Sequence, residues 1–60
     1  MSDRILRINE VLRLVPVSRA TLYRLIRRGE FPKPVQLGSN AVGWRESMIQ
    51  EWIKARPEAR

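Results

Sequence analysis

Cysteine and histidine are absent from this 60-residue chain, and its six acidic residues stand against twelve basic ones. Without cysteine, the chain has neither a disulfide framework nor a zinc finger to stabilise it, and we expect no bound metal. The same absences remove the thiol nucleophile and the commonest general base of an enzyme. The few acids form no pair, and no glycine-rich phosphate loop occurs. We therefore expect no catalysis, no cofactor and no small-molecule ligand.

A long apolar run is missing as well. No stretch approaches the roughly 20 apolar residues of a membrane span, and the first residues, Met1-Ser2-Asp3-Arg4, lead into no signal peptide. We expect a cytoplasmic, nucleoid-associated protein without a membrane partner. Sixty residues make one small domain, which covers residues 1–60 with flexible ends at 1–4 and 57–60.

What the sequence does contain is positive charge, concentrated in one part of the chain. The formal net charge is +6. Residues 13–33 hold six basic residues and one acid, whereas residues 34–44 hold no charged residue. Clustered positive charge of this kind suits a polyanionic partner.

The stretch from Val17 to Gly29 predicts a helix with a clear start and end. Ser18 can accept a backbone N–H bond as the N-cap, and Gly29 can adopt the left-handed conformation that closes a helix. At 3.6 residues per turn, the helix has an apolar face and an opposite face that carries arginines. Its four arginines have no acid among them, so we expect an external counter-charge, for which DNA phosphate is the candidate. The apolar face contains Leu22, Leu25 and Ile26, and the opposite face contains Ala20, Tyr23, Arg24 and Arg27.

Another helix is predicted just before this one. Residues 8–15 repeat apolar side chains at helical spacing, and Pro16 ends the repeat. So short a connection to Ser18 is typical of a helix-turn-helix. Ile5 and Leu6, ahead of the first helix, could form a short extended arm or an edge strand.

A hairpin is predicted after the second helix. Phe31 is the expected apolar anchor of the proline-rich segment that leads into it. Residues 35–37 and 41–44 alternate in polarity as short strands do, and Gly38-Ser39-Asn40 between them is suitable turn chemistry. Asn40 fits a turn because asparagine tolerates left-handed geometry.

The last helix completes the predicted fold. Ser47 and Gln50 match a capping box with Ser47 as the N-cap, and Pro57 ends the helix. The order helix, turn, helix, hairpin, helix predicts a mainly α domain with a small β-hairpin, which is a winged helix-turn-helix. The predicted core comprises Ile8, Val11, Leu12, Val15, Val17, Leu22, Leu25, Ile26, Phe31, Val42, Trp44, Ile49, Trp52 and Ile53.

Several motifs together resemble the AlpA family of small phage and prophage transcriptional regulators. These motifs run in order from about Arg4 to Arg56. The chain departs from the family at Pro16, where many relatives carry a glycine in the turn, and we interpret this as a tolerated change. The resemblance implies a fold related to MerR-type activators and phage excisionases, with helix 18–28 in the major groove of double-stranded DNA and hairpin 35–44 as the wing. It also implies action on promoters that control prophage excision. The motifs are Arg4-Ile5-Leu6-Arg7, Glu10-Val11, Ser18-Arg19-Ala20-Thr21-Leu22-Tyr23-Arg24-Leu25, Gly29-Glu30-Phe31-Pro32-Lys33-Pro34-Val35, Leu37-Gly38, Val42-Gly43-Trp44 and Trp52-Ile53.

Candidate DNA contacts follow from position in these elements. The start of a recognition helix points at base edges, and a small or methyl-bearing side chain can pack on a thymine methyl. Residues further along the helix and before the wing are better placed to hold phosphates. The base-edge candidates are Arg19, Ala20, Thr21, Tyr23 and Arg24; the phosphate candidates are Ser18, Arg27, Arg28 and Lys33; the wing candidates are Ser39 and Asn40.

Other interpretations of the same residues remain open. The arginine face could be an ordinary solvated helix surface, and Trp44 and Trp52 could stack on bases, although their apolar alternation favours core packing. An excisionase-like protein that bends attachment-site DNA would have the same fold and charge. A basic adaptor for an acidic protein partner is a more remote alternative. Because one small helix-turn-helix offers little surface for tight binding, a dimer or a cooperative array on DNA is a further expectation.

Overall fold

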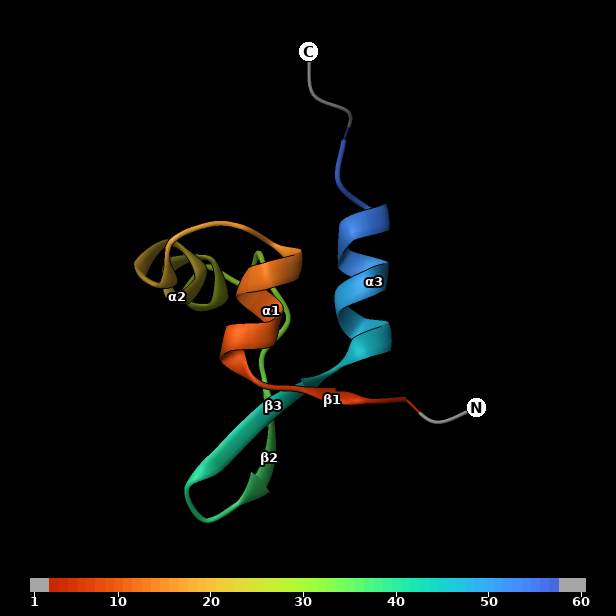
Figure 1. The fold of residues 1–60 in the computed structure, drawn as a ribbon. Coiled ribbons are helices and arrows are strands. Elements are labelled where there is room, and N and C mark those ends of the chain that lie inside the picture. The colour runs from red at the N-terminus through yellow and green to blue at the C-terminus, as the bar shows by residue number, and fades with distance from the viewer. Residues whose placement is uncertain (1–2, 58–60) are drawn as a thin grey trace.

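The computed structural model describes residues 3–57, which form three helices and a three-stranded antiparallel sheet whose β2–β3 hairpin projects away from the helices (Figure 1). The strand order is β1-β3-β2, so β3 lies in the middle. This architecture is compatible with a winged-helix-like DNA-binding fold. The remainder of the expected flexible ends, residues 1–2 and 58–60, lies outside the described residues. The elements are β1 (Ile5–Leu6), α1 (Ile8–Leu14), α2 (Arg19–Arg27), β2 (Val35–Gly38), β3 (Ala41–Arg45) and α3 (Glu46–Lys54).

The predicted helices and hairpin are confirmed, and the N-terminal arm is a strand. Within β1, Leu6 is the register partner of Trp44 in β3. This pairing adds a third strand to the expected hairpin and carries Leu6 into the core. None of the helices in residues 3–57 has the length and apolar character needed to cross a membrane.

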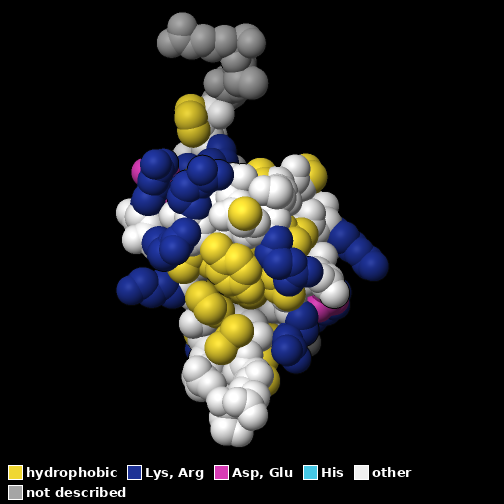
Figure 2. Space-filling view, turned by 90° about the vertical axis from the view of Figure 1, so that its left-hand side faces the viewer, with side chains coloured by type: hydrophobic (Ala, Val, Ile, Leu, Met, Phe, Trp, Pro, Cys, Tyr) yellow, Lys and Arg dark blue, Asp and Glu magenta, His cyan; other side chains and the backbone are white. Residues whose placement is uncertain are grey.

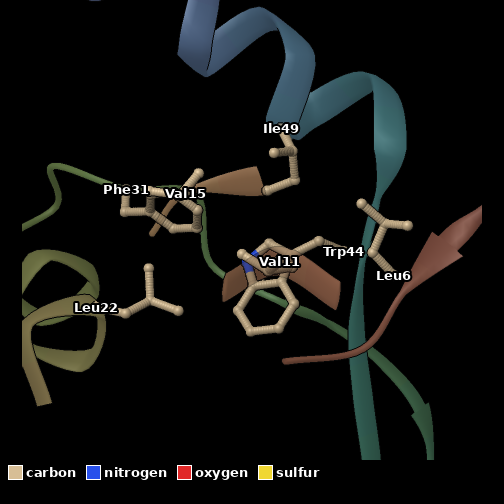
Figure 3. Packing of buried hydrophobic residues seen from close by; sticks show 7 residues of the cluster. All are labelled: Leu6, Val11, Val15, Leu22, Phe31, Trp44 and Ile49. Atoms are coloured by element: carbon tan, nitrogen blue, oxygen red, sulfur yellow. The ribbon is translucent and has the colours of Figure 1, made fainter. Parts of the chain in front are cut away.

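The core is one cluster of apolar side chains from β1, α1, α2, β3 and α3 and from the segments that follow α1 and α2 (Figure 3). Leu6, absent from the predicted core, is only 2% exposed. The prediction that Val17, Val42 and Ile53 belong to the core is wrong, because these side chains are 36%, 40% and 37% exposed. They lie in the turn after α1, near the end of the hairpin and in the last turn of α3, where the core does not reach. The cluster comprises Leu6, Val11, Val15, Leu22, Phe31, Trp44 and Ile49, with Ile8, Leu12, Leu25, Ile26 and Trp52 packed around it.

Phe31 is held by the two tryptophans, which confirms it as the anchor of its segment. Its ring meets Trp52 and Trp44 edge-on, with centroids 4.7 Å and 6.4 Å away. The Trp52 indole N–H donates to the Glu30 carbonyl at 2.7 Å, and the Trp44 indole N–H donates to the Pro32 carbonyl at 2.8 Å. The indoles thus bind the backbone on both sides of Phe31. Both tryptophans serve the fold, as their apolar alternation predicted.

The N-terminus of α3 differs from the prediction. The helix begins at Glu46, so Ser47 lies inside the first turn and is not the N-cap. The missing acceptor comes from Asp3, which is 44 residues away in the sequence. Its carboxylate accepts from the Ser47 backbone N–H at 2.9 Å and from the Ser47 hydroxyl at 2.6 Å. These hydrogen bonds lower the pKa of the Asp3 carboxyl. Pairing of β1 with β3 makes this contact possible because it brings the chain start to the start of α3.

Glu10 plays the corresponding role at the start of α1. Its carboxylate accepts from the Arg7 backbone N–H at 3.0 Å and pairs with the Arg4 guanidinium at 2.8 Å. The bond from Arg7, together with the charge of Arg4, lowers the pKa of the Glu10 carboxyl. Asp3 and Arg4, which belong to the end expected to be flexible, therefore both make side-chain contacts.

Candidate nucleic-acid interface

The two ends of α2 have the caps that the sequence predicts. The Ser18 hydroxyl oxygen accepts from the Thr21 backbone N–H at 3.1 Å and donates to the Thr21 hydroxyl at 2.8 Å. At the other end, Gly29 has φ +74°, and its N–H donates to the Ile26 carbonyl at 3.1 Å. The N–H of Glu30 reaches the Leu25 carbonyl at 2.9 Å, which completes a Schellman motif. Local chemistry therefore fixes where this helix starts and stops.

The apolar side of α2 fixes which face looks outward. Leu22 is fully buried in the core, and Leu25 and Ile26 are half-buried against it. The opposite face is exposed along its length, including Tyr23 at 47%. Figure 2 looks onto the side of the molecule where α2 lies and shows Lys and Arg side chains around a central apolar patch, with little acidic surface. The exposed residues of this face are Ala20, Tyr23, Arg24 and Arg27, with Arg19 and Arg28 beside them.

The arginines of α2 have no carboxylate within ion-pair distance among residues 3–57, where the one such pair joins Arg4 to Glu10. Two of them bind neutral oxygens. The Arg19 guanidinium donates to the Asn9 side-chain carbonyl at 2.8 Å, and the Arg24 guanidinium donates to the Thr21 hydroxyl at 3.2 Å. Neutral acceptors leave the positive charge uncompensated, so this surface attracts anions.

Asn9 is a residue of this surface that sequence reasoning missed. It lies in the first turn of α1, and its side chain reaches the start of α2 only because the helices pack together. A single polar residue near the start of a helix gives no signal of such a contact in the sequence.

The hairpin carries the remaining candidates. Lys33 is exposed in the segment that leads into β2, and Ser39 and Asn40 are exposed at the turn between the strands. Gly29 is the one residue in 3–57 with positive φ, so Asn40 occupies the turn without the left-handed geometry that was its predicted reason for being there. A register irregularity between Gln36 and Gly38 accommodates this turn. The hairpin projects from the helices in Figure 1 and forms the lower end of the face seen in Figure 2.

A sequence model of the family described as "Prophage CP4-57 regulatory protein (AlpA)" matches residues 4–57. The chain belongs to the AlpA family. It is similar to the uncharacterized protein ORF88 of Enterobacteria phage P4, with 46% identity over 54 residues that cover 90% of the chain and 61% of the phage protein. It is also similar to the DNA-binding transcriptional activator AlpA of Escherichia coli (strain K12), with 37% identity over 59 residues. That match covers 88% of the chain and 84% of the activator.

In this AlpA-family chain the predicted site residues fall into two groups. Those from Ser18 to Arg28 lie in α2 or at its two caps, whereas Lys33, Ser39 and Asn40 lie along the hairpin and its approach. The caps of α2 and the paired strands of the hairpin hold each group in place.

Proposed function

We propose that the chain is a sequence-specific double-stranded DNA-binding transcriptional regulator built as a winged helix-turn-helix of MerR type. Helix 18–28 enters the major groove, and hairpin 35–44 is the wing. The observation that carries this proposal is the exposed face of α2, whose arginines have no carboxylate partner among the described residues. The similarity to the Escherichia coli protein AlpA, a DNA-binding transcriptional activator, supports the same assignment.

Base contacts are assigned to the start and centre of α2. Arg24 and Tyr23 project from the exposed face, and an arginine can bind guanine with two hydrogen bonds. The Arg24 guanidinium now binds the Thr21 hydroxyl, a neutral partner that it can exchange for a base edge at little cost. Arg19 and Ala20 complete this group, with the Thr21 methyl as a further thymine contact.

Phosphate contacts are assigned to the two ends of the surface. Arg27 and Arg28 lie in and just after the last turn of α2, and Lys33 is exposed at the approach to the hairpin. Ser18 caps the helix start and lies where helices bind anions through their free N–H groups. Ser39 and Asn40 carry no charge, so they would contribute hydrogen bonds from the wing.

Selection from a random duplex pool, followed by affinity measurements across salt concentrations, tests this function. Binding sites should be enriched, and log affinity should fall linearly with log salt by about 0.9 per neutralised phosphate. Lys33→Ala should weaken binding to every duplex alike and reduce the slope by about one unit. Lys54→Ala, which removes an exposed lysine from the end of α3, is the matched control and should leave the slope unchanged. A flat salt dependence would refute DNA binding and favour an acidic protein partner.

Footprinting separates a regulator from an excisionase-like protein. Protection of a promoter supports transcriptional regulation. Occupancy of an attachment site by several adjacent copies, together with bending of that DNA, would favour the recombination role.

A further inference from the structure

Arg7 lies between the two groups of candidate DNA-contacting residues, one in α2 and one in the hairpin. It stands between β1 and α1, and its neighbours in the sequence contact both sides. Asn9 accepts a hydrogen bond from the Arg19 guanidinium at 2.8 Å, which places the start of α1 beside the start of α2. Leu6 pairs with Trp44 in β3, the central strand that continues into the hairpin. Figure 1 shows the start of α1 between α2 and the hairpin.

Main-chain contacts hold Arg7 at this place. A Cβ atom at Gly43 would lie 2.9 Å from the Leu6 carbonyl oxygen, which belongs to the peptide group that joins Leu6 to Arg7. Glycine at position 43 therefore lets this peptide group lie against β3. From the side of α1, the Arg7 N–H donates to Glu10 Oε1 at 3.0 Å, and the Arg7 carbonyl accepts from the Val11 N–H at 3.0 Å. A substitution of the Arg7 side chain leaves these contacts intact.

The charge of the Arg7 side chain is not compensated within residues 3–57. The side chain is exposed, and no carboxylate in this part of the chain lies within ion-pair distance of its guanidinium. Glu10, whose carboxylate accepts from the Arg7 N–H, forms its ion pair with Arg4. The charge of Arg45, at the end of β3, adds to the hydrogen bonds that lower the pKa of the Asp3 carboxyl. The charges of Arg4 and Arg45 thus act on acids of the chain itself, whereas that of Arg7 is available to an external anion.

Positive surface extends from α2 toward the hairpin. Figure 2 shows Lys and Arg side chains on both sides of the central apolar patch and down to the start of the hairpin, whose residues 34–44 are uncharged. A sugar-phosphate strand separates the two grooves of a duplex. A side chain that lies between a helix in one groove and a hairpin beside it therefore meets phosphates.

We propose that the Arg7 guanidinium binds a phosphate of double-stranded DNA, between the bases read by α2 and the backbone contacted by the hairpin. The proposal rests on the proposed DNA-binding function. A phosphate contact of this kind fixes the register and orientation of a protein on the duplex and carries no sequence information. Arg7 therefore adds affinity that is the same for every sequence, and it holds α2 and the hairpin in one orientation on the DNA.

Salt titration of variants at Arg7 tests this contact. Arg7→Gln and Arg7→Ala remove the charge with and without a long polar side chain, whereas Arg7→Lys keeps the charge. Arg45→Gln is the matched control, because it removes the same charge from an exposed arginine of the same sheet. Each variant and the parent are measured on the selected duplex and on random duplex at several salt concentrations, and thermal melting verifies folding.

Both uncharged variants at Arg7 should weaken binding to the two duplexes alike and lower the salt slope by about one unit. Arg7→Lys should keep the slope of the parent, and so should Arg45→Gln. Equal changes of slope for Arg7→Gln and Arg45→Gln would reflect a general loss of charge and would overturn the proposal. An unchanged slope for Arg7→Gln would overturn it as well.

Uncharged methylphosphonates, introduced one at a time into the selected duplex, locate the phosphate. The parent should lose affinity several-fold at each phosphate that it contacts. Arg7→Gln should become insensitive at one of these positions, beside the bases whose preference depends on Arg24, and should keep the sensitivity of the parent elsewhere. The same pattern of sensitivity in both proteins would refute the contact.

The two proposals fail in different ways. A parent that shows no salt-dependent binding to any duplex would refute the proposed function, and the contact of Arg7 with it. A parent that binds its selected duplex, together with an Arg7→Gln variant that behaves like the parent, would refute the contact of Arg7 alone.

Discussion

Arg4 and Arg24 are the same residue type in opposite surroundings. Arg4 forms an ion pair with Glu10 at 2.8 Å, whereas the Arg24 guanidinium binds only the Thr21 hydroxyl among residues 3–57. The carboxylate that pairs with Arg4 also caps α1, so the positive charge at the chain start is used within the fold. Among residues 3–57, no carboxylate lies within ion-pair distance of the α2 arginines.

The same contrast extends to the neutral groups. Around Phe31, both indole N–H groups find a backbone carbonyl, and no buried side-chain polar atom in residues 3–57 lacks a partner. In the interior and at the N-terminal contacts, polar groups are paired within the protein, whereas the positive charges on the exposed face of α2 have no carboxylate partner among residues 3–57. We call the first the closed region and the second the open region. Substitutions in the closed region should therefore change the stability of the fold, and substitutions in the open region should change the binding of a partner.

The largest effect is expected from Phe31→Ala. This change removes a ring that is 3% exposed and packed between Trp44 and Trp52. Loss of a buried phenylalanine costs about 3–5 kcal/mol, which is most of the stability of a domain of this size. Thermal melting should show a large fall in the transition temperature, and Phe31→Leu should recover part of it. An unchanged melting temperature would mean that the aromatic contacts do not hold the fold together.

A smaller effect, on binding alone, is expected from Arg24→Ala. If Arg24 binds a base edge, the variant should lose about 1–3 kcal/mol at the selected site and little on random duplex. Its melting temperature should remain that of the parent. Arg4→Ala is the matched control from the closed region and should lower the melting temperature slightly without changing sequence preference. Equal weakening on specific and random duplex would reassign Arg24 to phosphate contact.

A pH-dependent effect is expected at the N-terminal contacts. The Ser47 hydroxyl and N–H lower the pKa of Asp3, and the Arg7 N–H lowers that of Glu10. A carboxyl whose folded-state pKa is depressed stabilises the fold above its unfolded pKa, which is about 4, and this stability is lost as pH falls through the folded-state value. Denaturant unfolding should therefore show stability constant near neutrality and declining below about pH 4–5. Asp3→Ala should be less stable at neutral pH and should decline less steeply in acid. An identical acid profile in parent and variant would show that the Asp3 contact contributes nothing.

Local signals explain how much of this fold the sequence could predict. The Ser18 and Gly29 caps each depend on a few neighbouring residues, so they define the ends of α2 without any knowledge of the tertiary fold. The prediction of Ser47 as an N-cap failed because the acceptor at the start of α3 is Asp3. Asp3 reaches Ser47 only because β1 pairs with β3. Strand alternation places Val42 on the same side as Trp44, yet it carries no information about where the core ends.

The residues of the candidate site also divide into those that a local pattern predicts and those that depend on tertiary packing. Helical periodicity alone indicates that Arg24 and Arg27 share an exposed face with Tyr23, and the structure has them exposed. Their roles toward base or phosphate remain predictions. Contacts between helices, such as that of Asn9 with Arg19, depend on packing that no local pattern specifies.

The smallest and most specific effect concerns Asn9. Its side-chain carbonyl accepts from the Arg19 guanidinium at 2.8 Å, a neutral contact within the open region that connects α1 to the start of α2. If this bond orients Arg19 toward a base, Asn9→Ala should weaken binding at the selected site a few-fold, roughly the contribution of one exposed hydrogen bond. Arg19→Ala should then remove the sensitivity to Asn9, so the double variant binds like Arg19→Ala alone. Asn9→Asp supplies a charged acceptor that holds Arg19 but neutralises it, so its salt slope should fall while the melting temperature is retained. Binding isotherms for the four variants on specific and random duplexes provide the measurement, and strictly additive losses from Asn9→Ala and Arg19→Ala would show that the two residues act independently.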